Sequence, residues 1–203
     1  MKLQNLLLTL GLIALPIVIF GIYQQAQQAM ATPLPVGFPA PTPSDRIEVK
    51  QYPAYRSGTY VYEGKLEDAT GNAFNPLYNH ISSNNIAMTS PVEARYPTET
   101  LDRKVDRGIA QVSFLYRSTD IVPQQVAKDI KVEDHPPMLV VSIGIQGAYS
   151  YTSYQDNLAK LQRWLAEHPE YQAIGEPRRF FYDSPFTPAP LKRSEVQIPI
   201  RAI

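Results

Sequence analysis

Hydrophobic and polar positions follow two different periods in residues 46–203, and these periods predict both strands and helices. Residues 47–62 alternate β-forming with polar side chains, and residues 138–145 form a continuous β-prone run. Residues 68–81 and 152–168 instead carry hydrophobic side chains at helical spacing. Together these patterns predict an α+β domain.

The order of these elements repeats along the chain. The first predicted helix is followed by strand candidates at 86–96 and 109–117, and the second by candidates at 178–182 and 195–200. A strand–helix–strand–strand unit used twice predicts an antiparallel or mixed sheet with two helices on one face. We therefore expect one compact domain made of two similar halves.

Each predicted helix carries one apolar stripe. The stripe of the first helix consists of Phe74, Leu77, Tyr78 and Ile81. Because proline is tolerated only near a helix start, Pro76 predicts that the regular part begins near Asn75. The stripe of the second helix consists of Tyr151, Tyr154, Leu158, Leu161 and Leu165. Thr152 and Gln155 are spaced to form a capping box there, and Trp164 is expected at the half-buried flank.

The first 31 residues differ from the rest of the chain. Residues 6–23 contain no charged side chain, and this length lies between that of a signal-peptide core and that of a membrane span. An A-x-A motif at 29–31 keeps two alternatives open, a cleaved signal and an uncleaved anchor. Lys2 is the nearest charged side chain, so in both cases the N-terminus is expected in the cytoplasm and the rest of the chain outside it.

Residues 32–45 contain five prolines between Thr32 and Ser44. This composition predicts an extended spacer of roughly 40 Å at about 3.1 Å per residue, or a disordered tail. In either case the segment is not expected to form a domain. The predicted organisation is therefore an anchor or signal peptide at 1–31, a linker at 32–45 and a domain at 46–203.

Charge and composition narrow the function classes. Basic and acidic residues are balanced at 19 each, and the basic residues are scattered, so we expect no nucleic-acid partner. The chain has no cysteine, which excludes disulfides, thiolate metal sites and cysteine nucleophiles.

Three histidines could carry metal, haem or acid–base chemistry. His80 on the first helix is interpreted as a solvated residue in preference to an axial haem ligand. His135 precedes two prolines and is assigned to a turn. His168, in the last turn of the second helix, is expected to interact with the helix C-terminus.

Other chemical signals are weak. Glu133 and Asp134 are adjacent, so on a strand they would point to opposite faces, and no nucleophile, phosphate or dinucleotide motif is present. The pairs Arg178–Arg179 and Lys192–Arg193 could meet ligand carboxylates, but we interpret them as solvated. We predict no catalytic residue and no metal site.

Several short motifs occur in an order that resembles the SOUL/haem-binding protein family. Ile47–Tyr52 is similar to the family's opening Y-E-V-R-x-Y strand, and Asn85–Val92 to its K-I-A-M-T-A-P-V signature. Tyr182–Phe186 and Glu195–Val196 resemble its Y-x-S-P-F…N-E-V-W terminus. The resemblance covers about residues 46–200, and the fold that it implies is a distorted antiparallel β-barrel or sheet of two similar halves.

The resemblance also implies a ligand site. Family proteins bind haem and other tetrapyrroles in a shallow apolar groove formed by the first helix and a later loop. Carried over by position, this groove would use Phe74, Leu77, Tyr78, Pro185 and Phe186. Gln51 stands where some members have an axial histidine, and Gly71 and Asn79 stand where basic residues can meet the propionates. The resemblance then implies that a tetrapyrrole is bound through apolar contact, with Tyr78 as a weak ligand.

We therefore expect a membrane-tethered or exported domain that binds haem or a related tetrapyrrole as a non-catalytic carrier or buffer. One alternative is a protein-interaction module that presents the same groove to a protein partner. A less favoured alternative is a small-molecule hydrolase that uses Glu133 or Glu195.

Overall fold

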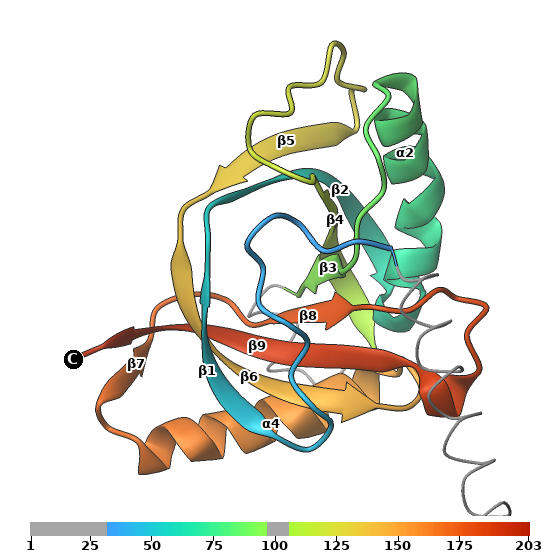
Figure 1. Ribbon diagram of the computed structural model, residues 1–203. Helices are drawn as coiled ribbons and strands as arrows, with labels where there is room; N and C mark the ends of the chain where they lie inside the picture. Colours follow the sequence, from blue (N-terminus) through green and yellow to red (C-terminus); the bar gives the residue numbers. More distant parts are fainter. Residues whose placement is uncertain (1–31, 97–105) are drawn as a thin grey trace, which may run out of the picture. The chain divides into compact units, whose positions relative to one another are not determined.

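Both predicted halves are present in the computed structural model, which describes residues 32–96 and 106–203 (Figure 1). The first half contains β2 (Tyr55–Lys65), α2 (Ala69–Ser83), β3 (Val92–Arg95) and β4 (Arg107–Leu115). The second half contains β6 (Met138–Gln146), α4 (Tyr151–Glu167), β8 (Arg178–Phe181) and β9 (Arg193–Ala202). The predicted strand–helix–strand–strand repeat is confirmed. Short additional elements are β7 (Tyr171–Ala173) and two 3-10 turns, Leu66–Asp68 and Ala189–Leu191.

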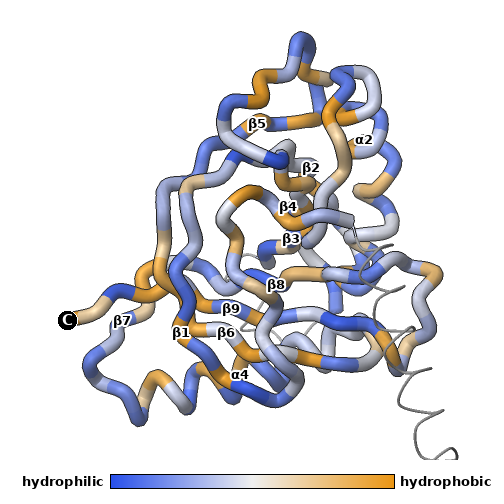
Figure 2. The backbone as a smooth tube through the Cα atoms, viewed as in Figure 1, coloured by the Kyte–Doolittle hydropathy of each residue, from blue (hydrophilic) through white to orange (hydrophobic). Residues whose placement is uncertain are grey.

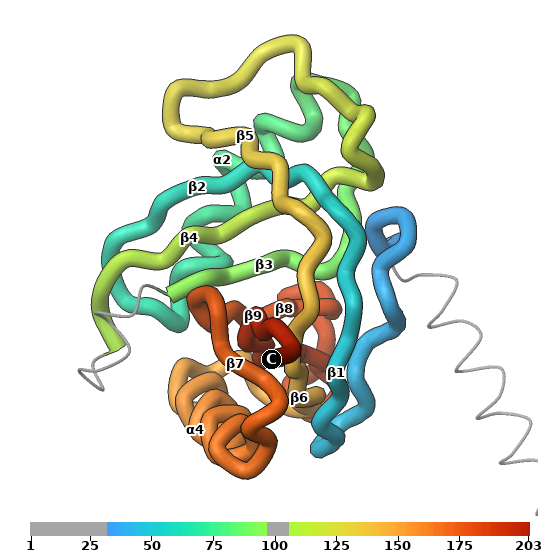
Figure 3. The backbone as a smooth tube through the Cα atoms, turned by 90° about the vertical axis from the view of Figure 1, so that its left-hand side faces the viewer, coloured from blue at the N-terminus to red at the C-terminus, as the bar shows by residue number. Residues whose placement is uncertain are grey.

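Two further strands, β1 (Ile47–Tyr52) and β5 (Ile130–His135), cross between the halves. β1 leads into β2 but pairs with β6, whereas β5 leads into β6 but pairs with β2, as Figure 3 shows. β3 and β8 pair at the centre, so the strand order is β1-β6-β9-β8-β3-β4-β2-β5, with β7 beside β9. All these pairs are antiparallel, and β1 and β5 are the ends of the order. The predicted antiparallel α+β fold is confirmed as a distorted sheet that does not close.

The two helices pack on the same face of this sheet and share one hydrophobic core. α2 buries Ala69, Ala73, Leu77 and Ile81, and α4 buries Tyr151, Tyr154, Leu158 and Leu161. Hydrophobic and hydrophilic residues alternate along α4 in Figure 2, as expected of a helix with one buried side. The stripe predicted for α4 is confirmed, and Trp164 is half-buried as expected.

The predicted ends of the helices were less accurate. α2 begins at Ala69, and Pro76 lies inside it, so the start predicted near Asn75 is wrong. Ala69 and Ala73 are fully buried, and we attribute the extra turns to this packing, which outweighs a proline cost of about 3 kcal/mol. The α4 cap is Ser150, whose side chain accepts a hydrogen bond from the backbone N–H of Ser153 at 3.1 Å.

The opposite side of the sheet, here called the helix-free face, has its own aromatic cluster. Its buried members are Tyr52, Tyr55, Leu115, Val140 and Phe180. The Pro-rich segment (blue in Figure 1) lies against this face: Phe38 contacts the ring of Tyr52 edge-on, with centroids 4.9 Å apart. The compact unit therefore begins at Pro33, and residues 33–44 form an arm on the domain in place of the expected free spacer.

Nothing in the described residues tests the predicted anchor, because residues 1–31 lie outside them. Within residues 32–96 and 106–203, no helix is long and apolar enough to cross a membrane.

Candidate functional site

The outer surface of α2 carries two of the predicted groove residues side by side. The rings of Phe74 and Tyr78 are nearly parallel, with centroids 5.7 Å apart and an interplanar angle of 9°. Tyr78 is 48% exposed, while Phe74 is half-buried and packs edge-on against Phe114. Gly71 lies on the same helix face two turns before Tyr78, with open space around its Cα. The result is a pair of parallel aromatic rings on the outer surface of α2, with open space where a side chain at Gly71 would stand.

The other three predicted groove residues lie elsewhere. Leu77 is fully buried between α2 and the sheet, so it supports the helix and does not face a ligand on the outer surface. Pro185 and Phe186 lie in the loop between β8 and β9, where Phe186 is 95% exposed. The structure thus brings Phe74 and Tyr78 together, and within residues 32–96 and 106–203 Phe186 makes no aromatic contact with either ring.

His80 is buried, so its interpretation as a solvated residue is wrong. It is 2% exposed, and its Nε2 forms a hydrogen bond of 2.6 Å with the hydroxyl of Tyr116. Gly58 on β2 makes this possible, because a Cβ there would come within 3.1 Å of the imidazole. Burial lowers the pKa of His80 and raises the pKa of Tyr116 to about 12. His80 is therefore not positioned to bind haem iron on the helix surface.

The remaining histidines are also engaged within the fold. His135 ends β5, where its ring stacks on Tyr55 at 4.3 Å and its Nε2 lies 3.0 Å from the Ser57 hydroxyl. It is part of a strand and partly buried, so the turn assignment is wrong. His168 caps α4, as predicted, with its Nδ1 2.7 Å from the carbonyl oxygen of Trp164.

These positions test how well a haem would fit. The flat ring pair on α2 suits a planar apolar group, and the Tyr78 phenol is the ligand that this surface offers to iron. Arg178 and Arg179 cannot meet propionates, because they are 2% and 1% exposed, and their interpretation as solvated residues is wrong. The ring pair on α2 therefore suits the flat apolar face of a tetrapyrrole, whereas Arg178 and Arg179 do not offer partners for its carboxylates.

A buried polar chain crosses the helix-free face and was missed from the sequence. Arg178 donates hydrogen bonds to the Gln197 amide oxygen at 2.9 Å and to the Tyr55 hydroxyl at 2.8 Å. Tyr55 donates to Glu93 at 3.0 Å, and Gln197 donates to Glu195 at 2.6 Å. Two fully buried glutamates, one from each half, are thus joined through a buried arginine.

Glu195 has a complete set of partners at its end of the chain. Lys50 Nζ lies 3.0 Å from one carboxylate oxygen, which also accepts the backbone N–H of Thr42 from the arm. The Ser142 hydroxyl donates to the other oxygen at 2.9 Å. Burial raises the pKa of the neighbouring Tyr52, and the Glu195 charge adds to this shift. This carboxylate is held in place by contacts within the fold.

The sequence contained one indication of this buried chain of polar side chains. Glu93, Arg178 and Glu195 interrupt short strands that are otherwise β-prone, which marks charged residues on sheet faces. Their partners could not be found from spacing, because Glu93 and Arg178 are 85 positions apart and Lys50 and Glu195 are 145 positions apart.

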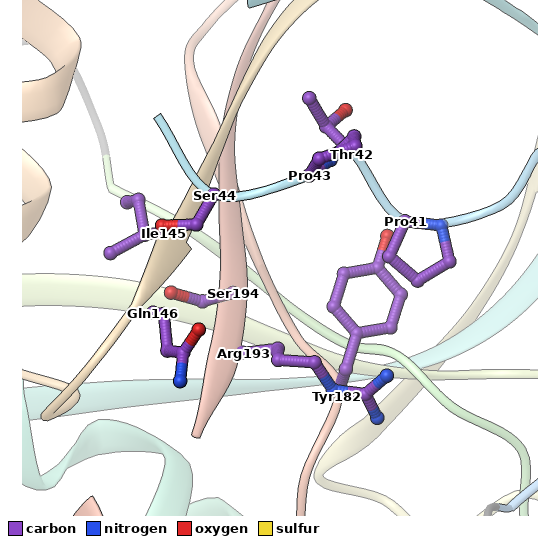
Figure 4. Close-up of a pocket in the computed structure, with 9 residues that line it drawn as sticks. All are labelled: Pro41, Thr42, Pro43, Ser44, Ile145, Gln146, Tyr182, Arg193 and Ser194. Atoms are coloured by element: carbon purple, nitrogen blue, oxygen red, sulfur yellow. The ribbon is translucent and has the colours of Figure 1, made fainter. Parts of the chain in front are cut away.

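A small pocket of about 210 Å³ lies where the arm meets the start of β9 (Figure 4). Its lining residues are Pro41, Thr42, Pro43, Ser44, Ile145, Gln146, Tyr182, Arg193 and Ser194. Pockets for drug-sized ligands usually measure roughly 300–1,000 Å³, so this one is too small to enclose a tetrapyrrole.

Comparisons with known proteins agree with this fold. The sequence profile described as SOUL heme-binding protein matches residues 39–199. No curated protein gives a significant match. Among solved structures, the EcmrR C-terminal domain is 15% identical with a TM-score of 0.62, over 78% of this chain and 98% of that chain.

Two structures from Listeria innocua are also similar. An uncharacterized conserved protein is 13% identical, with a TM-score of 0.59, over 78% of this chain and 94% of its own. A protein named as a hydrolase is 11% identical, with a TM-score of 0.56, over 80% of this chain and 94% of its own. At such identities these likenesses show the fold alone.

The family profile spans both halves, from the arm to Pro199 in β9, and it agrees with the motifs at residues 47–52, 85–92 and 182–196. The chain belongs to the SOUL heme-binding protein family.

Proposed function

We propose that this domain binds haem or a related tetrapyrrole on the outer surface of α2, as a non-catalytic carrier or buffer. The observation that carries the proposal is the parallel pair of Phe74 and Tyr78, with Tyr78 half-exposed and Gly71 open beside it. Aromatic faces of this kind suit a flat apolar ligand. The family membership supports the ligand class.

The proposal includes a location. The uncharged run at residues 6–23 would tether the domain to a membrane, or direct its export, with residues 33–203 outside the cytoplasm.

Titration of haemin into residues 33–203, followed by absorption in the Soret region, tests ligand binding. We expect a saturable Soret shift at micromolar protein. Tyr78→Ala removes the exposed ring and should weaken binding at least tenfold, which corresponds to about 1.4 kcal/mol. Tyr78→Phe keeps the ring and removes the phenol, so it separates stacking from iron ligation.

A matched control is Ile174→Ala, which also shortens an exposed apolar side chain but lies next to β7, away from α2. It should leave the titration unchanged. No saturable shift with the unaltered protein would reject haem as the ligand, and equal affinity of Tyr78→Ala would reject this surface as the site.

The hydrolase alternative gains little support from the geometry. Glu195 is fully buried and has four hydrogen-bond donors, and Ser57, next to His135, has no exposed surface. A nucleophile or acid must reach its substrate, so neither residue is suited to hydrolysis in this conformation.

A further inference from the structure

An uncharged loop projects from the domain between β8 and β9. Residues 184–191, here called the 184–191 loop, contain no charged side chain. Phe186 is 95% exposed and Leu191 is 42% exposed, while Pro185, Pro188 and Pro190 are exposed as well. Contiguous exposed apolar residues of this kind mark interaction sites more often than single ones do.

The loop is held in shape at its base. Arg193 and Asp183, which flank it, form an ion pair with an N–O distance of 2.7 Å, and the Arg193 backbone N–H donates to the same carboxylate. Lys192 lies over the ring of Tyr149 at 5.0 Å. The Arg193–Asp183 ion pair and Lys192 thus lie at the base of the loop, and the apolar residues form its tip.

The backbone of the loop has few free donors. Its three prolines have no N–H, and the N–H groups of Phe186, Thr187 and Leu191 are hydrogen-bonded inside the loop. Unsatisfied backbone donors are costly in an apolar surrounding, so this arrangement lowers the cost of placing the tip among lipids.

The chain enters the domain beside this loop. The Ser90 backbone N–H donates to the carbonyl oxygen of Pro33 at 3.0 Å, and the Ser90 hydroxyl donates to that of Tyr182 at 3.0 Å. Nine residues separate Tyr23, the end of the uncharged run, from Pro33. They can span at most about 35 Å when fully extended. A membrane that holds the run would therefore keep this edge of the domain nearby.

We propose that the 184–191 loop inserts its tip into the interfacial region of the bilayer that holds residues 6–23, with Phe186 as the inserting side chain. The proposal rests on the membrane tether of the proposed function. An aromatic tip with Lys192 at its base matches the layered chemistry of that region, where aromatic rings meet the acyl chains and lysine meets lipid phosphates. The loop and the tether would then fix the orientation of the domain.

The absence of cysteine in the chain allows a direct test. Phe186→Cys in the full-length protein is labelled with an environment-sensitive fluorophore and reconstituted into vesicles of equal parts phosphatidylcholine and phosphatidylglycerol. Ala202→Cys is the matched control, because it is exposed and lies at the far end of β9. At about 3.4 Å per residue, the ten residues of β9 place it roughly 30 Å from Arg193.

We expect lipid-attached spin labels to quench the fluorophore at 186 at least threefold more strongly than the one at 202, with a blue shift at 186 only. Flotation of the same samples with the vesicles measures whether the protein is attached to the membrane. Flotation with equal quenching at both positions would overturn the loop proposal and leave the tether standing. A protein that does not float overturns both, while haemin titration of residues 33–203 remains an independent test of ligand binding. A blue shift at 186 that needs haemin and not lipid would assign Phe186 to the ligand and overturn the proposal.

Discussion

The two halves share one order of elements but place their aromatic side chains differently. α4 directs Tyr151 and Tyr154 into the core, where they are 5% and 0% exposed and pack against Tyr96. α2 packs on the sheet through residues such as Ala69, Ala73 and Leu77, and it leaves Phe74 half-buried and Tyr78 48% exposed. The aromatic side chains of α4 thus stabilise the core, whereas α2 keeps an aromatic ring accessible to solvent.

The reason lies in what the sheet presents to each helix. Under α2, Gly58 leaves room for His80, and Ala69 and Ala73 are fully buried. The repeat of strands and helices therefore decides where each helix lies. The size of the side chains between helix and sheet decides which half retains a surface for a ligand.

The largest effect is expected where the halves meet. Glu93→Ala leaves Arg178 buried without its carboxylate, which lies 3.7 Å away. Removal of one partner of a buried pair typically costs about 3–5 kcal/mol, so the urea midpoint should fall sharply. Glu133→Ala is the control, because this glutamate on β5 is 25% exposed and should cost about 1 kcal/mol or less. Similar midpoints for both variants would contradict a joining role for Glu93.

A second pair of variants compares the two helices directly. Tyr154→Ala empties a fully buried site, and large-to-small changes of buried aromatic residues cost about 3–5 kcal/mol. Tyr78→Ala removes a half-exposed ring and should change the free energy of unfolding by about 0.5 kcal/mol or less. Urea unfolding measures both. If Tyr78→Ala were as destabilising as Tyr154→Ala, the aromatic surface of α2 would be part of the core.

Two glycines of the first half should respond in opposite directions. Gly58→Ala brings a methyl group within 3.1 Å of His80, whose position is fixed by Tyr116, so we expect a loss of about 1–3 kcal/mol. Gly71→Ala on the exposed side of α2 meets no atom within 4 Å and should gain roughly 0.5–1 kcal/mol. Thermal unfolding measures both, and a stable Gly58→Ala protein would show that His80 can move.

The smallest effect concerns pH. Burial lowers the pKa of His80 and His135 below the ordinary value of 6.5. Below pH 6.5 the unfolded chain therefore binds more protons than the folded one, and stability falls as the pH falls. His80→Gln should remove the contribution of His80 to this pH dependence, so the slope of stability between pH 7 and 5 should become flatter. His135→Gln removes the contribution of His135 on β5 in the same way. Unfolding midpoints at several pH values measure the slopes, and unchanged slopes in both variants would contradict the assignment.

The elements were largely predictable because periodicity and proline positions are local signals. The hydrophobic spacing of residues 152–168 identified α4, and β3 lies within the strand candidate predicted at 86–96. The start of α2 was not predictable, because the local cost of Pro76 is outweighed by packing against strands that lie elsewhere in the chain. Proline composition likewise predicted an extended spacer or a disordered tail, and it could not predict that Phe38 packs on the helix-free face.

The candidate site divides in the same way. Phe74 and Tyr78 follow one another at helical spacing, so their adjacency was predictable, whereas burial of His80 depended on Gly58 from another strand. Arg178 and Arg179 were misassigned because adjacent strand residues point to opposite faces, and here both faces are covered.

The sequence by itself determined the repeated strand–helix–strand–strand order, the family and the aromatic pair on the first helix. The order and the family follow from short motifs and periodic segments, each recognisable without its partners in the fold, and the pair follows from helical spacing. Only the tertiary structure decided which histidine is buried, which charges are paired and which half exposes its rings. Those outcomes depend on contacts between residues far apart in the chain, where the volume and charge of the partner set the free energy of burial.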